Sequence, residues 1–397
     1  MLAKIFGTTA VIALMGAASI GNAQESSGSG DLKERLSVAK AWLDGTLDNY
    51  GDHTITYDGE PITIRATSHI PDLSESAVFG KQAYRVLEAM SGGKIIVQDR
   101  WGGTVHGVKE GLEANRSGIT DMAACFSNLN ASSFPLTQAL ALPGIFPNEA
   151  VMAAVASQLA EEYFRPEFER YGVYIGYIAG SAPFSIFSKK PITKLEDLAG
   201  LKVRTGSGLQ QEIYEALGAT PVSMGSGDLY SALQRGLIDV VTTSIAAAHT
   251  FRVNEVASDF TYTPINVAPL EYCMNPRTYE ALPPDLQKVV YDWNQQMAQV
   301  FTQLRFIGAS EEAREQFIDE GVNYHEIDSE EWTRWQAKFE PVVEAYIEQG
   351  EKDGLPMREL VAKMRELSRK YSELTLNELL QETIESPAIG VSPVASN

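Results

Sequence analysis

The sequence predicts an α/β fold in two lobes, joined by crossing chain segments and braced by one long helix. The chain has 397 residues, 44% of them hydrophobic, which is enough for two separate cores. Strand-like and helix-like segments alternate in two successive rounds, over residues 61–181 and 182–268. A helical pattern from Pro283 to Gly321 has weak break signals, and a helix of that length is expected to brace both lobes.

Residues 1–23 have the pattern of a signal peptide. Lys4 provides the positive charge, Ile5–Ile20 the apolar segment and Gly21–Ala23 a cleavage site of small residues. The apolar segment is shorter than the roughly 20 residues of a membrane span, so we expect export, with a membrane anchor as the alternative. No later stretch is as apolar, so the mature chain is not expected to insert into a membrane.

Residues 24–60 look like an N-terminal extension of the main fold. They begin with a Ser/Gly-rich linker and continue with an expected helix from Asp31 to Leu47. The main fold then begins at Pro61, in the first round. Its expected elements are strand Ile62–Thr67, helix Ser74–Met90, strand Lys94–Gln98, helix Gly107–Asn115, strand Ile119–Phe126, helix Asn148–Tyr171 broken at Pro166, and strand Val173–Ala179. Such alternation implies a parallel sheet, with a ligand crevice at the carboxyl ends of its strands.

The second round repeats this scheme in the other lobe. Its expected elements are strand Ser185–Ser188, helix Lys194–Ala199, strand Leu201–Val203, helix Leu209–Leu217, strand Thr220–Ser223, helix Gly227–Arg235 and strand Val240–Thr243. Strand Pro264–Met274 then returns. We therefore assign residues 61–181 and 269–308 to lobe 1. Residues 182–268 and 309–385, with C-terminal helices over Ser329–Lys370, form lobe 2, and residues 386–397 a disordered tail.

Composition excludes several classes of function. The 52 acidic residues outnumber the 32 basic ones, which argues against nucleic acid or an anionic membrane surface as a partner. No CxxC or HxxxH spacing occurs, so no metal site is expected, and nothing in the sequence calls for a cofactor. There is no Gly-rich phosphate loop and no recognisable pair of nucleophile and base, so we do not expect an enzyme.

The two cysteines, Cys125 and Cys273, both lie in apolar, strand-like segments. Export would allow a disulfide between them. We expect two buried free thiols, and the disulfide remains the alternative.

The residue that best suits ligand binding is Arg204. A short strand, Leu201–Val203, delivers it to the Gly/Ser-rich turn Thr205–Gly208, from which the helix Leu209–Leu217 departs. A guanidinium offers two parallel donors to a carboxylate, a geometry that lysine cannot reproduce. The alternative for Arg204 is a structural ion pair between the lobes.

Four sequence segments, in this order, resemble the substrate-binding proteins of tripartite ATP-independent periplasmic (TRAP) transporters, the DctP-like family. They read PITKLEDLAGLKVR at residues 191–204, ALGATPV at 216–222, DLYSALQRGLID at 228–239 and LPPDLQKVV at 282–290. The resemblance covers about residues 61–350. It implies a two-lobed periplasmic binding protein fold with a hinge and a long interlobe helix, which closes on an organic acid and passes it to a membrane permease.

The resemblance also suggests ligand-binding residues in lobe 2 and beside it. Arg204 matches the family's arginine that pairs with the ligand carboxylate. Thr243 stands where an asparagine usually contacts the ligand, and Phe184 where sialic-acid-binding members have a second arginine. These departures suggest a less charged, partly apolar monocarboxylate, and ordinary core packing is the alternative for Phe184. Tyr230 and Met224 are expected to be core residues.

Lobe 1 is expected to supply the other ligand contacts. His69 aligns with a position that contacts ligand in relatives, and Ser127 or Asn128 is expected to add a hydroxyl or amide; each of these three residues has helix capping as its alternative. Weaker candidates are Trp101 and His106, on a loop at the rim, and Tyr272 on the returning strand.

The sequence therefore predicts a periplasmic solute-binding protein that captures a small organic acid for the membrane subunits of a TRAP permease. The alternatives are a sensory binding protein that presents its ligand to a receptor, and an exported enzyme on the same fold.

Overall fold

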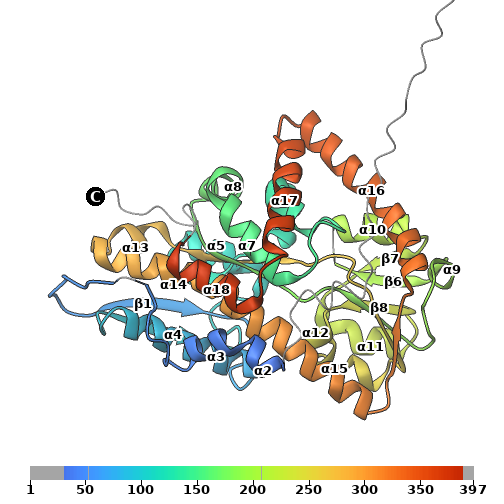
Figure 1. The fold of residues 1–397 in the computed structure, drawn as a ribbon, viewed down its shortest axis with the longest axis horizontal. Helices are drawn as coiled ribbons and strands as arrows, with labels where there is room; N and C mark the ends of the chain where they lie inside the picture. The colour runs from blue at the N-terminus through green and yellow to red at the C-terminus, as the bar shows by residue number, and fades with distance from the viewer. Residues whose placement is uncertain (1–30, 52, 207, 388–397) are drawn as a thin grey trace, which may run out of the picture.

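The structure is a computed structural model and describes residues 31–51, 53–206 and 208–387. The predicted signal peptide and nearly all of the predicted disordered tail lie outside these residues. The described residues form two lobes side by side, each built on its own β-sheet (Figure 1). No helix in these residues has the length and apolar character needed to cross a membrane.

The sheet of lobe 1 has the order β2-β1-β3-β10-β4. Its strands are β1 (Ile62–Thr67), β2 (Ile95–Arg100), β3 (Met122–Ala124), β4 (Tyr174–Gly180) and β10 (Pro269–Met274). Strand β1 pairs in parallel with β2 and β3, whereas β10 pairs antiparallel with β3 and β4. The expectation of a parallel sheet is thus wrong for β10, which enters from lobe 2 and runs against its neighbours.

The sheet of lobe 2 has the order β11-β9-β5-β8-β6-β7. Its strands are β5 (Ser185–Ser188), β6 (Lys202–Thr205), β7 (Thr220–Ser223), β8 (Val240–Thr243), β9 (Asp259–Tyr262) and β11 (Asn323–Glu326). Strand β6 is parallel to β7 and β8, and β5 is antiparallel to β8 and β9. The sequence did not predict β9 and β11, two short strands at one edge of this sheet.

Two chain segments cross between the lobes beside one another. The first joins β4 to β5 and the second joins β9 to β10. Ser181 N donates to Ala268 O (2.9 Å), and Phe184 N donates to Asn266 O (3.2 Å). The two crossings run in opposite directions; their lobe 1 ends lie beside the carboxyl end of β4 and their lobe 2 ends beside the carboxyl end of β8. In both lobes, therefore, the carboxyl ends of the parallel strands lie at the edge toward the other lobe, where α/β folds bind ligands.

The long helix predicted across both lobes is present. It consists of α14 (Pro284–Thr302), a π-helical turn (Gln303–Gly308) and α15 (Ala309–Asp319). The α14 segment packs on β4 of lobe 1, and α15 packs on α12 (Ile245–Thr250) of lobe 2. Thr302 Oγ1 accepts a hydrogen bond from Gly180 N (2.9 Å), so the π-helical turn begins beside the point where the chain leaves lobe 1.

The N-terminal extension lies along this long helix. In place of the single helix expected over Asp31–Leu47, it forms α2 (Leu32–Arg35) and α3 (Ser37–Leu43). Trp42 Nε1 donates to Gln296 Oε1 of α14 (2.5 Å), and Arg35 forms an ion pair with Glu311 of α15 (3.0 Å). The extension therefore contacts the long helix on both sides of its π-helical turn.

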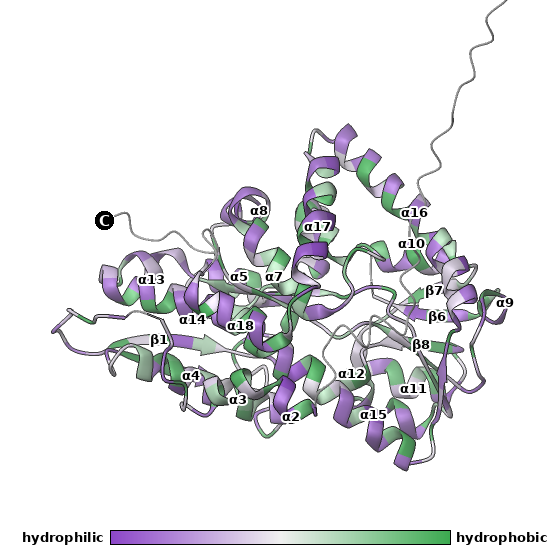
Figure 2. Cartoon of the chain, in the orientation of Figure 1, coloured by the Kyte–Doolittle hydropathy of each residue, from purple (hydrophilic) through white to green (hydrophobic). Residues whose placement is uncertain are grey.

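Three helices close the described chain: α16 (Ser329–Lys352), α17 (Met357–Tyr371) and α18 (Leu376–Glu385). Helix α16 packs on α10 (Leu209–Ala216) in lobe 2, and α17 packs on α7 (Glu149–Leu159) in lobe 1. Hydrophilic and hydrophobic residues alternate around α16 and α17 (Figure 2), as expected for helices with one buried face. The sequence did not predict α18, whose Asn377 bonds to the extension through Val38 N (3.2 Å).

The remaining α-helices are α4 (Glu75–Met90), α5 (Gly111–Arg116), α6 (Pro135–Gln138), α7 (Glu149–Leu159), α8 (Arg165–Glu169), α9 (Leu195–Leu198), α10 (Leu209–Ala216), α11 (Leu229–Gln234) and α13 (Pro276–Glu280). A π-helical turn, Ala160–Phe164, separates α7 from α8. The expected break at Pro166 thus takes the form of a widened turn just before the proline, which has no N–H to continue the regular pattern.

Candidate ligand-binding site

Arg204 lies near the end of β6, at the edge of lobe 2 that faces lobe 1. Its side chain is buried (6% exposed). Nε and Nη2 donate to Met224 O (3.1 and 3.0 Å), and Nη1 donates to Thr242 O (3.0 Å). These bonds leave one N–H on each terminal nitrogen, apart from a long contact of Nη2 with Ser226 Oγ (3.5 Å). The backbone thus fixes the guanidinium while keeping two donors for another group.

The charge of Arg204 is not balanced within the described residues, since no carboxylate there forms an ion pair with it. Burial lowers the pKa of the guanidinium from its usual value. The lowered pKa is still far above neutral pH, so the guanidinium keeps its proton. A buried, unpaired charge is costly. An anion bound at this edge of lobe 2 would remove this cost. The alternative of an interlobe ion pair has no partner in the described chain.

Two further predicted residues lie close to this edge of lobe 2. Thr243 is the last residue of β8, is buried (3% exposed) and pairs with Ser185 at the start of β5. Phe184 lies on the first crossing segment and is partly buried. Its carbonyl accepts a hydrogen bond from Thr263 Oγ1 (3.2 Å) on the second crossing segment. The backbone of Phe184 therefore helps to hold the two crossings together.

The loops after β1, β2 and β3 converge at the facing edge of lobe 1, as predicted. Gly103 N donates to Ser68 O (3.0 Å), and His106 Nε2 lies 2.6 Å from Thr67 Oγ1. The ring of His69 meets that of Phe126 edge-on at 5.9 Å. Burial, followed by the nearby His106, lowers the pKa of His69, which is therefore neutral at pH 7.

Ser127 is fully buried and already has internal partners. Its Oγ donates to Glu271 Oε1 (2.5 Å) and accepts from Gln138 Nε2 (2.6 Å), while its N donates to Glu271 Oε2 (3.0 Å). Burial raises the pKa of Glu271 to about 7. This arrangement suits a residue that orients the loop. Asn128, next in the chain, is exposed.

A disulfide joins Cys125 to Cys273. The expectation of two free thiols is wrong, because pairing of β3 with β10 brings the two residues together across 148 positions of sequence, with their Cα atoms 5.9 Å apart. Phe126 and Ser127 are the two residues after Cys125, and Tyr272 is the residue before Cys273. The disulfide therefore fixes the loop after β3 to the strand that carries Tyr272.

Tyr272 belongs to a cluster of aromatic rings. Its ring stacks on Tyr177 at 4.5 Å and meets Phe126 at 6.0 Å and Phe301 at 5.6 Å, both edge-on. Tyr272 is a predicted site residue, whereas the other three rings were not predicted from the sequence. They come from β4, the loop after β3 and α14, so no local pattern connects them.

Trp101 lies at the rim of lobe 1, where its Nε1 donates to Asp99 Oδ2 and its ring lies 6.3 Å from that of Tyr84. The sequence analysis also missed Asn266, on the second crossing segment. It is buried (5% exposed), and neither its amide oxygen nor its nitrogen has a hydrogen-bond partner in the described chain. Buried amides are normally paired, so Asn266 joins the candidates for ligand contact.

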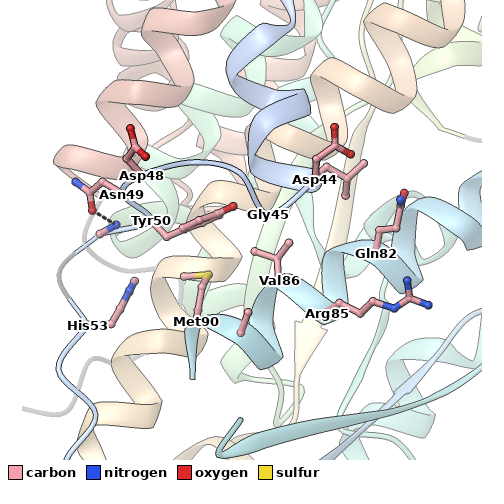
Figure 3. Close-up of a pocket in the computed structure, with 13 residues that line it drawn as sticks. Asp44, Gly45, Asp48, Asn49, Tyr50, His53, Gln82, Arg85, Val86 and Met90 are labelled. Carbon is pink, nitrogen blue, oxygen red and sulfur yellow. Dashed lines mark hydrogen bonds between the residues drawn. The ribbon is translucent and has the colours of Figure 1, made fainter. Parts of the chain in front are cut away.

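Two cavities lie away from these residues. One, of about 560 Å³, lies between the N-terminal extension and α4 (Figure 3). Asp44, Asp48 and Arg85 provide charges of both signs there, and Asn49 Oδ1 accepts from Gly51 N (2.8 Å). The other, of about 810 Å³, includes Tyr171 and Gly172, which precede β4 at the opposite edge of the sheet from the cleft. Neither cavity is lined by a predicted site residue.

The sequence profile of bacterial extracellular solute-binding protein family 7 (DctP) matches residues 75–349, well over half of the chain. The chain belongs to this family. The resemblance to TRAP binding proteins is thus confirmed. The family 7 match leaves β1, α2, α3, α17 and α18 outside it.

Curated family 7 relatives include the C4-dicarboxylate-binding periplasmic protein DctP of Rhodobacter capsulatus. It is 28% identical over 298 residues, which cover 71% of this chain and 86% of that protein. The uncharacterized protein YiiZ of Salmonella typhimurium is 29% identical over 207 residues, or 51% of this chain. The chain spans 63% of the length of YiiZ and 36% of a solute-binding protein from Sulfitobacter.

Solved structures of TRAP solute-binding proteins share the two-lobed fold. A protein from Desulfovibrio salexigens has a TM-score of 0.70 and 25% identity, covering 79% of this chain and 97% of its own. One from Rhodoferax ferrireducens, in complex with copurified benzoate, has a TM-score of 0.72 and 21% identity, covering 79% of this chain and 99% of its own. The family 7 fold therefore accounts for the two sheets and their crossings, and this chain adds segments around it.

Proposed function

We propose that this chain is a periplasmic solute-binding protein that captures a small organic carboxylate between its lobes and delivers it to the membrane subunits of a TRAP transporter. The observation that carries the proposal is the buried guanidinium of Arg204, held by backbone carbonyls and without an acidic partner in the described chain. A carboxylate supplies the missing charge and accepts the two remaining donors.

Relatives support a carboxylate as the ligand. The Rhodobacter relative is named for C4-dicarboxylates, the Rhodoferax structure holds benzoate, and a structure from Roseobacter denitrificans holds β-D-glucuronate. These ligands differ in size and shape but are all acid anions. Family membership thus favours an acid, while the residues of this chain must decide which one.

The predicted residues divide between the two sides of the cleft. On the lobe 2 side, Arg204 would anchor the carboxylate, with Thr243 and Phe184 beside it. The other predicted contacts, from lobe 1, are His69, Ser127, Asn128, Tyr272 and Trp101. Contacts from both lobes favour the closed state, because the ligand stabilises whichever conformation lets both sides bind it. The crossing segments and the long helix would form the hinge.

We infer that no chemical step is needed, because capture and release account for every predicted residue. The test is native mass spectrometry of the protein as purified, followed by a thermal-shift screen with carboxylic acids. We expect a copurified acid, or a rise in melting temperature with at least one acid of the screen. A folded, ligand-stripped protein that responds to no carboxylic acid would refute the proposal, and sustained turnover of a bound acid would indicate an enzyme.

A further inference from the structure

Lobe 1 contains an aromatic wall, which we define as Phe126, Tyr177, Tyr272 and Phe301. The rings contact one another at centroid distances between 4.5 and 6.3 Å. Phe126, Tyr272 and Phe301 are only partly buried, so the wall keeps some open surface. Phe126 lies two residues beyond the end of β3, at the edge facing lobe 2, and the ring of His69 extends the wall there at 5.9 Å.

The aromatic wall is uncharged near neutral pH. Burial raises the pKa of Tyr272 and Tyr177 above their ordinary value, and the nearby phenols of Tyr272 and Tyr84 raise the pKa of Tyr177 further. The pKa of His69 is lowered, so its ring is neutral as well. Among the predicted site residues, Arg204 is then the single permanent positive charge, which suits a ligand with one carboxylate.

A second carboxylate would meet an unfavourable environment in lobe 1. The buried carboxyl of Glu271 lies just behind the loop after β3, bonded to Ser127, with a pKa raised to about 7. A second negative charge nearby would be repelled by Glu271 when it is ionised. A second carboxylate would also lose its hydrogen bonds to water, and the aromatic rings cannot replace them. A flat apolar body, by contrast, would gain from ring contacts.

We propose that the ligand is an aromatic monocarboxylate, whose carboxylate is bound by Arg204 and whose ring packs against Phe126 and Tyr272 of the aromatic wall. This rests on the proposed function, since it names the class of acid for that same cleft. Offset or edge-to-face packing of a ligand ring on these side chains contributes binding free energy beyond that gained by burying an aliphatic group of the same size.

The first test is a calorimetric titration of the ligand-stripped protein with matched acids. Benzoate is compared with cyclohexanecarboxylate, phenylacetate with cyclohexylacetate, and both pairs with succinate. We expect the better aromatic acid to bind about tenfold more tightly than its saturated counterpart, with succinate weaker still. Equal or tighter binding of the saturated acids or of succinate would overturn the aromatic proposal while leaving carboxylate capture intact.

The second test changes the wall itself. Tyr272→Leu is expected to remove most of the preference for an aromatic over a saturated acid, whereas Tyr272→Phe should keep it. Tyr174→Leu is the matched control, because Tyr174 lies at the other end of β4, away from the cleft. If the Tyr272→Leu variant is not folded at the temperature of the titration, the Phe126→Leu variant is tested in its place. A folded variant of either kind that keeps the full aromatic preference would contradict the proposal.

Discussion

The two sides of the cleft differ in how they are built. On the lobe 2 side, one guanidinium is fixed by backbone carbonyls of Met224 and Thr242. On the lobe 1 side, partly exposed aromatic rings stand on a frame made by the Cys125–Cys273 disulfide and the Glu271–Ser127 hydrogen bonds. One side therefore suits recognition of a charge, which requires fixed donors. The other suits recognition of the rest of the molecule, which requires shape and apolar contact.

The largest effect is expected on the charged side. Arg204→Ala should reduce carboxylate affinity at least about 30-fold, because loss of one partner from a buried charge pair costs roughly 2–5 kcal/mol. Arg204→Lys should recover little, since lysine lacks the two parallel donors. Calorimetry measures both, with Arg358→Ala as the control, because Arg358 lies on α17 in exposed ion pairs. Near-normal affinity in Arg204→Lys would contradict a two-donor contact.

The frame of lobe 1 should matter more for stability than for charge recognition. Replacing both cysteines, as in Cys125→Ser with Cys273→Ser, is expected to lower the free energy of unfolding by about 2–4 kcal/mol. Denaturant titration measures this change. Affinity should fall less than in Arg204→Ala, because the guanidinium is untouched. A double variant as stable as the wild type would show that the disulfide contributes little to this frame.

Glu271 should make stability depend on pH. Its carboxyl has a pKa of about 7 when folded, against 4.5 ordinarily, so the folded state binds more protons between these values. Stability conferred by the protonated form is therefore complete below about pH 4.5 and is lost as pH rises through 7, by roughly 3 kcal/mol at most. Glu271→Gln should flatten the curve between pH 5 and 7. An unchanged slope in that variant would assign the dependence to other groups.

The smallest effect is expected at Thr243, beside Arg204. Its hydroxyl would add one neutral hydrogen bond to the ligand, so Thr243→Val should cost about 1 kcal/mol of binding, or roughly fivefold in affinity. Calorimetry with the best acid of the panel measures this. Thr220→Val, on the exposed start of the neighbouring strand β7, serves as the control. A loss as large as that of Arg204→Ala would mean that Thr243 has a different role.

The sequence predicts those parts of the fold that depend on local pattern. Strands β1, β5, β7 and β8 have the bounds expected for them, and Arg204 lies where strand and motif placed it. The family profile confirms the overall architecture. The alternation of apolar residues and the glycine breaks were sufficient to predict these strand bounds, because both patterns reflect contacts within each segment.

Features that depend on long-range pairing could not be predicted in this way. The disulfide requires β10 to run antiparallel beside β3, and the aromatic wall joins four distant segments. The unpaired amide of Asn266 became evident only when its surroundings were known. For Ser127, the sequence predicted a ligand contact but not that Glu271 would bind its hydroxyl.

The most direct test of carboxylate capture by Arg204 is a crystal structure of the protein with its bound acid. We predict that the two carboxylate oxygens lie within hydrogen-bond distance of Nη1 and Nη2 of Arg204, with the rest of the ligand facing lobe 1. A ligand whose carboxylate lies elsewhere, with Arg204 paired to a carboxylate of the protein itself, would contradict this account.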